Sequence, residues 1–120
     1  MPSYSHSWTA LATTFKALSQ LIPGQSDTSE EANLYYRRAR LAAAEERFDV
    51  ALVFCFKAIE VAPRHLEARL LLARIHDKGL QNFEAAVAGY KKVIALAGYD
   101  GENPHCVAAR EALDILVQKA

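Results

Sequence analysis

The sequence predicts an all-α fold built from stacked pairs of antiparallel helices. The first observation is an internal repeat, because residues 51–63 (ALVFCFKAIEVAP) match residues 86–98 (AVAGYKKVIALAG) after a shift of 35 residues. Upstream, Ala39 matches Ala73 at an offset of 34. The second observation is that apolar residues recur at three- and four-residue steps, the spacing of amphipathic helices. A helix-sized unit that recurs at such a period is typical of a helical repeat array.

Composition and charge fit a single globular domain, residues 1–120, with 52% apolar and 23% charged residues. The 14 basic and 14 acidic side chains cancel, which argues against general affinity for nucleic acid or an anionic membrane. No apolar run approaches the ~20 residues of a membrane span, and the first residues do not form a signal peptide. Two cysteines, Cys55 and Cys106, are too few for a disulfide framework. We therefore expect a cytoplasmic protein.

Six helices are predicted, and the first three lie before Pro63. The first, residues 7–22, carries an apolar side chain every three or four residues, at Trp8, Leu11, Phe15, Leu18 and Ile22. After a polar linker, the second helix occupies residues 29–44 and the third residues 49–61. On periodicity alone the core of the third helix, VALVFCF, could form a buried strand. Its repeat partner is rich in Ala and Lys, which favour helix, so we predict a helix.

The remaining three helices are each bounded by a recognisable signal. The fourth occupies residues 66–77 and is broken by Gly79. Asn82 is predicted to cap the fifth, which runs to residue 97. The last helix occupies residues 103–119, with Asn103 as its cap and proline in its first turn, where the missing N–H costs nothing.

Small residues stand where paired helices must approach closely, and they align between the two repeats. The aligned positions of the first repeat, residues 29–63, are Tyr35, Arg38, Ala39, Ala42, Ala51, Cys55, Ala58 and Pro63. Those of the second, residues 64–98, are Arg69, Leu72, Ala73, His76, Ala86, Tyr90, Val93 and Gly98, with one extra residue between Lys78 and Asn82. This pattern resembles the tetratricopeptide repeat, a 34-residue helix–turn–helix unit. The resemblance implies a right-handed α-solenoid, in which residues 7–22 belong to a degenerate preceding repeat and residues 103–119 form the capping helix.

The resemblance also implies a binding surface, because the first helix of each pair lines a concave groove in that family. The corresponding residues of this chain are Asn33, Tyr36, Arg37, Arg40, Glu67, Leu70, Leu71, Arg74 and Lys78. We therefore expect a non-enzymatic adaptor that binds a peptide or a helix of another protein, with acidic and apolar side chains. The alternative is that these are ordinary solvated helix charges.

A second candidate surface lies on the third helix, where Val53, Phe54 and Phe56 occupy positions that the family leaves facing outward. Exposed apolar patches usually mark interfaces. Two interpretations remain open. The helix of residues 7–22 could cover the patch within one chain, which we favour, or the chain could use it to form a homo-oligomer as a structural assembly subunit.

No motif for catalysis, metal binding or nucleotide binding is present. The sequence contains no H-E-x-x-H, no C-x2-C, no G-x-S-x-G and no P-loop. His105 and Cys106 are neighbours, but adjacent side chains on a helix point about 100° apart and do not form a dyad. We therefore expect no enzyme activity, no cofactor and no bound metal.

Overall fold

The computed structural model describes residues 28–119, and this part of the chain contains helices and no strand. The helices are α2 (Thr28–Ala44), α3 (Phe48–Val61), α4 (Leu66–Arg74), α5 (Phe83–Leu96) and α6 (Pro104–Lys119), and a short element η1 (Ile75–Gly79) continues α4. The all-α prediction is confirmed for these residues, including the helix over VALVFCF. The predicted helix of residues 7–22 lies outside the described residues.

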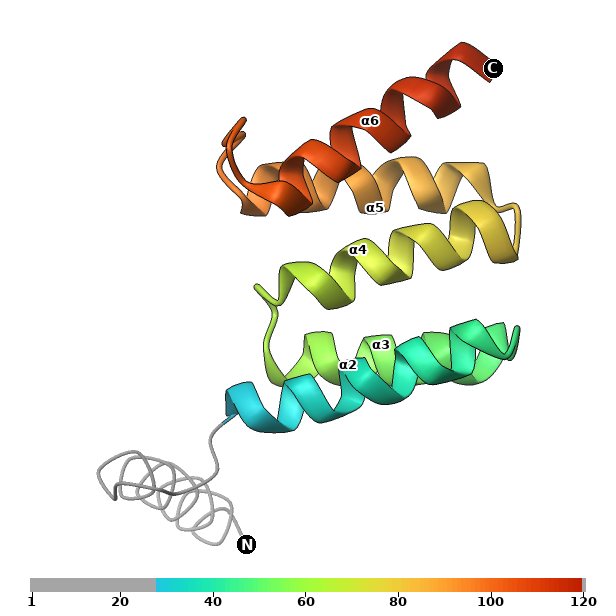
Figure 1. Cartoon of the computed structure of the whole chain (residues 1–120), viewed down its shortest axis with the longest axis vertical. Coiled ribbons are helices and arrows are strands. Elements are labelled where there is room, and N and C mark those ends of the chain that lie inside the picture. The colour runs from blue at the N-terminus through green and yellow to red at the C-terminus, as the bar shows by residue number, and fades with distance from the viewer. Residues whose placement is uncertain (1–27, 120) are drawn as a thin grey trace, which may run out of the picture.

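The helices form layers that follow one another along the long axis of the molecule. Figure 1 shows that α2, α4 and α6 run in one direction and that α3 and α5 run in the opposite direction. The hairpin of α2 and α3 packs against α4, and α5 packs between α4 and α6. Sequence neighbours are therefore also neighbours in space, as expected for short connections between antiparallel helices.

The predicted caps of the last two helices are present. Asn82 begins α5, where its Oδ1 accepts a hydrogen bond from the backbone N–H of Ala85 at 3.3 Å. At the start of α6, Asn103 Oδ1 accepts from the N–H groups of His105 at 2.9 Å and Cys106 at 3.2 Å. Both asparagines satisfy donors that have no partner within the helix, which fixes where each helix starts.

The end of the fourth helix differs from the prediction, because residues 75–79 form a π-helical turn. The N–H of Leu80 donates to the carbonyl of Ile75 at 2.9 Å, five residues back rather than four. Such a turn holds one residue more than an α-helical turn. It accommodates the extra residue that changes the repeat offset from 34 to 35, so the insertion lies inside the helix and not in a longer loop.

Two hydrophobic clusters form the core, and α4 with η1 contributes to both. The first consists of Ala39, Ala42, Ala51, Cys55 and Ile75, with Leu71 and Leu72 packed against it. The second includes Leu70, Ala73, Ala86, Tyr90, Val93, Ile94, Cys106, Ala109 and Leu116. The alanines allow close contact between helices. At Gly89 in α5 even a methyl group would lie 2.8 Å from Cβ of Ala73 in α4. None of the described helices is both long and apolar enough to cross a membrane.

Candidate functional site

Where α2 meets the start of α4, the structure brings together three of the predicted binding residues, Asn33, Tyr36 and Arg40. Tyr36 of α2 lies with its ring 5.4 Å from the imidazole of His65, which precedes α4. One turn further along α2, the guanidinium of Arg40 lies over the Tyr36 ring at 5.7 Å. A cation over an aromatic face is attracted by the ring quadrupole, so Tyr36 helps to position Arg40 on this face.

His65 connects α2 to the first turn of α4. Its Nδ1 accepts a hydrogen bond from the N–H of Ala68 at 3.1 Å, so this nitrogen carries no proton. The proton is therefore on Nε2, which donates to Oδ1 of Asn33 at 2.7 Å. A neutral imidazole thus caps α4 and holds α2 beside it, and the amide oxygen of Asn33 already has a protein partner.

A similar contact recurs at the next interface between these parallel helices. His105 in the first turn of α6 lies with Nε2 3.7 Å from Oε1 of Glu67 in the first turn of α4. Asn33 and Glu67 are repeat equivalents at an offset of 34. Sequence reasoning assigned both to ligand binding and gave no role to the histidines. The signal that could have revealed the histidines is their position at the starts of successive helices.

Four cations of the predicted set are exposed, namely Arg37, Arg40, Arg74 and Lys78. Arg40 lies over Tyr36 on this face, whereas Arg37 lines hollows on the Leu34–Leu41 side of α2. None of the four lies within ion-pair distance of a carboxylate in the range 28–119, where Arg47 lies 3.6 Å from Glu45. Arg40 and Arg74 are repeat equivalents. Exposed guanidinium groups without a carboxylate partner can accept carboxylates of a ligand in bidentate geometry.

Leu70 is a correction to the predicted binding set. It is only 5% exposed and belongs to the second hydrophobic cluster, so a ligand cannot reach it. The reason is that α4 is packed on two sides. It contacts the first hairpin through Leu71 and Leu72 and contacts α5 and α6 through Leu70 and Ala73, which leaves a narrow strip for solvent. Leu71 is half-buried at the edge of that strip.

The apolar patch predicted on α3 is smaller than expected. Val53 and Phe56 are 51% and 53% exposed, as predicted for outward-facing positions. Phe54 is half-buried instead, because the Tyr35 ring stacks on it with a centroid distance of 6.3 Å and the guanidinium of Arg38 lies 5.9 Å from its ring. The side chains of α2 thus cover Phe54, and only two apolar side chains of the predicted patch are exposed.

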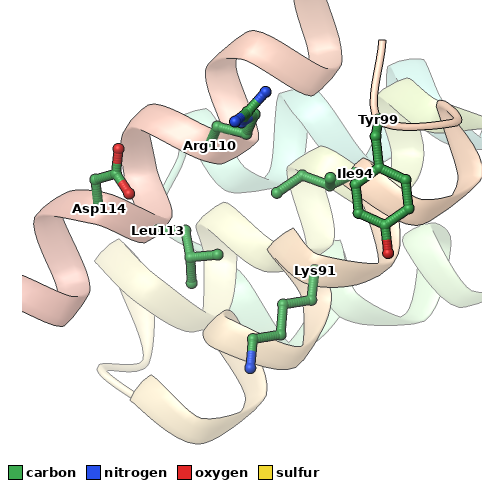
Figure 2. A pocket seen from close by; sticks show the side chains of 6 residues that line it. All are labelled: Lys91, Ile94, Tyr99, Arg110, Leu113 and Asp114. Carbon is green, nitrogen blue, oxygen red and sulfur yellow. The ribbon is translucent and has the colours of Figure 1, made fainter. Parts of the chain in front are cut away.

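A cavity between α5 and α6 was not predicted from the sequence. Its volume is about 470 Å³, and Figure 2 shows the six side chains that line it, which are Lys91, Ile94, Tyr99, Arg110, Leu113 and Asp114. Two cations, one carboxylate and an apolar wall could hold a small acidic side chain. The cavity depends on how α6 is placed against α5, and the repeat pattern contains no signal for it.

The two side chains with strongly raised pKa values, Cys55 and Tyr90, are buried in the core. Residues 28–119 contain no group of three or more side chains that could hold a metal ion. Burial raises the pKa of the Cys55 thiol from 9.0 to about 12, so it remains protonated at neutral pH. The pKa of the Tyr90 phenol is also held well above its ordinary value. Burial is the largest cause, and the hydrogen bond to Asp77 is a smaller one.

Comparison with known proteins identifies neither a family nor a function for this chain. No family model, no curated protein and no solved structure matches this chain. The α2–α4 face presents the guanidinium of Arg40 over the Tyr36 ring, and α4 contributes the half-buried Leu71.

Proposed function

We propose that this chain is a non-enzymatic adaptor that binds a peptide or a helix of a partner protein on the α2–α4 face. In this proposal the helix pairs form a right-handed, tetratricopeptide-like stack, and the protein works in the cytoplasm without a cofactor. The observation that carries the proposal is the set of exposed cations, Arg37, Arg40, Arg74 and Lys78, without ion-pair partners among the described residues.

The chemistry of the face defines the partner. Each exposed ion pair contributes only about 0.2–1 kcal/mol, so four of them contribute roughly 1–4 kcal/mol. Micromolar binding requires about 8 kcal/mol. The remainder has to come from apolar contacts, for which Tyr36 and Leu71 provide surface. We therefore expect a segment in which acidic residues are interspersed with apolar ones, and binding that weakens as salt screens the charges.

The test uses labelled peptides in which Glu or Asp alternates with Leu or Phe, with fluorescence anisotropy as the measurement. Wild type is compared with Arg40→Glu/Arg74→Glu and with the control Lys91→Glu/Arg110→Glu, which makes the same charge change at the α5–α6 cavity. We expect the first double variant to lose binding and the control to retain it. Equal binding by all three proteins removes the proposal. Loss in the control alone assigns the peptide to the cavity instead.

A second candidate function is self-association as a structural assembly subunit. It is favoured by the exposure of two neighbouring apolar side chains, Val53 and Phe56, on the outer side of α3. Solution mass across a dilution series tests it, with Phe56→Lys expected to shift the protein toward monomer. Val117→Lys, at another exposed apolar residue, is the matched control. A monomer at the highest concentration removes this candidate.

A further inference from the structure

An apolar stripe on α2 has no partner among the described residues. Leu34 and Leu41 are 40% and 66% exposed, and they stand seven residues apart, which places them on the same side of the helix. Two hollows lie along this side. One of about 470 Å³ is lined by residues that include Leu34 and Arg37, and one of about 380 Å³ is lined by Arg37, Arg40, Leu41 and Ala44. The stripe therefore adjoins the proposed peptide-binding surface at Arg37 and Arg40.

The internal repeat indicates which kind of element would cover this stripe. At the offset of 34, Leu34 corresponds to Ala68 and Leu41 corresponds to Ile75, and these two residues are 0% and 2% exposed. Ile75 is buried in the cluster of the preceding hairpin, together with Ala39 and other residues of α2 and α3. The α4–η1 segment thus packs onto the preceding hairpin at Ile75, and Ala68 at the other equivalent position is also buried. The stripe is the surface on which an element that precedes α2 would pack.

We propose that residues 8–22 of the same chain dock on the Leu34–Leu41 stripe. This segment carries apolar side chains at helical spacing, at Trp8, Leu11, Phe15, Leu18 and Ile22. It is joined to α2 by residues 23–27, which can span at most about 17 Å at ~3.4 Å per residue. Packed helices need only about 8–10 Å between their axes. The connection from α3 to α4 makes the same reversal with residues 62–65, which is one residue fewer.

The stripe suits this segment better than the Val53–Phe56 patch, which the sequence alone favours. The repeat equivalents of Val53 and Phe56, at the offset of 35, are Ala88 and Lys91. Both are exposed although their hairpin has α3 on one side and α6 on the other. These positions of the second helix in a pair are therefore not covered by the neighbouring elements of the stack. By contrast, Ala68 and Ile75, the equivalents of the stripe residues Leu34 and Leu41, follow the described α2–α3 hairpin and are buried.

The proposal places the single tryptophan of the chain beside Leu41. With residues 8–22 antiparallel to α2, Ile22 lies near the start of α2 and Trp8 lies about 21 Å further along, at 1.5 Å per residue. Leu41 is 13 residues after Thr28, a similar distance of about 20 Å. Trp8 fluorescence therefore reports docking without any added label.

The test is acrylamide quenching of Trp8 in the full chain, for wild type, Leu41→Glu and the conservative variant Leu41→Ile. We expect Leu41→Glu to give about twofold stronger quenching and a red-shifted emission, because one face of the indole loses its cover. Leu41→Ile should behave as wild type. Val117→Glu is the control, because it adds the same charge at a side chain of similar exposure on α6. Circular dichroism confirms that each variant keeps its helices.

Equal quenching in wild type and Leu41→Glu, with helicity retained, overturns the proposal. It is also overturned if quenching of the wild type strengthens on dilution together with a fall in mass, because the segment then docks on a second copy. Quenching that is independent of concentration and sensitive to Leu41→Glu supports docking within one chain. None of these outcomes depends on whether the α2–α4 face binds a peptide.

Discussion

His65 Nε2 donates a hydrogen bond to Oδ1 of Asn33 at 2.7 Å, while Nδ1 of the same ring accepts the N–H of Ala68 at 3.1 Å. One imidazole therefore caps α4 and attaches that helix to α2. At the next interface Nε2 of His105 lies 3.7 Å from Oε1 of Glu67, so a histidine approaches the preceding parallel helix in both places. These contacts lie on the same face as the proposed binding surface.

His65→Ala should lower the free energy of unfolding by about 1–2 kcal/mol, because the variant loses both the cap and the bond to Asn33. Urea denaturation measures the change. His65→Asn is the informative control, because asparagine can still cap α4 but is too short to reach Asn33. It should recover part of the loss. If a double-mutant cycle with Asn33→Ala shows no coupling, the contact contributes nothing to stability.

Gly89→Ala should destabilise the protein by about 1–3 kcal/mol, because the added methyl group would lie 2.8 Å from Cβ of Ala73. Combining it with Ala73→Gly should restore part of the loss, because that change removes the clashing atom. Gly101→Ala is the matched control, since a methyl group there meets no atom within 4 Å. Thermal unfolding that gives equal midpoints for Gly89→Ala and Gly101→Ala would contradict the close approach of α4 and α5.

Tyr90→Phe should cost about 1–3 kcal/mol, because it leaves the buried carboxylate of Asp77 without the phenol that donates to it at 2.9 Å. Tyr99→Phe removes the same hydroxyl from a ring that is 70% exposed and should change the stability little. Both are measured by chemical denaturation. A loss as large for Tyr99→Phe as for Tyr90→Phe would show that the Asp77 contact is not the cause.

Stability should fall as the pH rises above about 9, in part because of Cys55. Its pKa is raised from 9.0 to about 12 by burial, so between these values the unfolded chain releases a proton that the folded chain retains. Unfolding is then favoured by up to about 1.4 kcal/mol per pH unit. Cys55→Ala should flatten the slope measured between pH 8 and 10. The same slope in Cys55→Ala and wild type would assign the alkaline loss to other groups.

The helices could be predicted from the sequence because local signals bound them. Asn82 and Asn103 cap α5 and α6, and Pro63 follows the end of α3. The π-helical turn could not be predicted, although the extra residue was visible. Its location depends on which backbone carbonyls the packed helix leaves available, and Asp77 within it is held by Tyr90 from a different helix.

The candidate site was predicted less well than the fold, and the reason is tertiary. A periodic pattern shows which residues share a face of α4. It does not show how many of these faces are buried by neighbouring helices. Leu70 was placed on the open face, yet α5 and α6 bury it. Phe54 was placed on the surface, yet Tyr35 stacks on it. The arginines of the predicted set are exposed, as expected for cations without a buried partner.

The π-helical turn also affects how this chain can be aligned with others. Residues before Ile75 correspond between the two hairpins at an offset of 34, whereas residues from Phe83 onward correspond at 35. An alignment with one constant period would shift every residue of α5 by one position, which rotates its assignments by about 100° around the helix axis. A constant offset of 34 would pair buried Cys55 with Gly89 and exposed Phe56 with buried Tyr90, instead of with Tyr90 and Lys91. A family model that allows no insertion inside a helix will therefore give too low a score to any relative that has this turn.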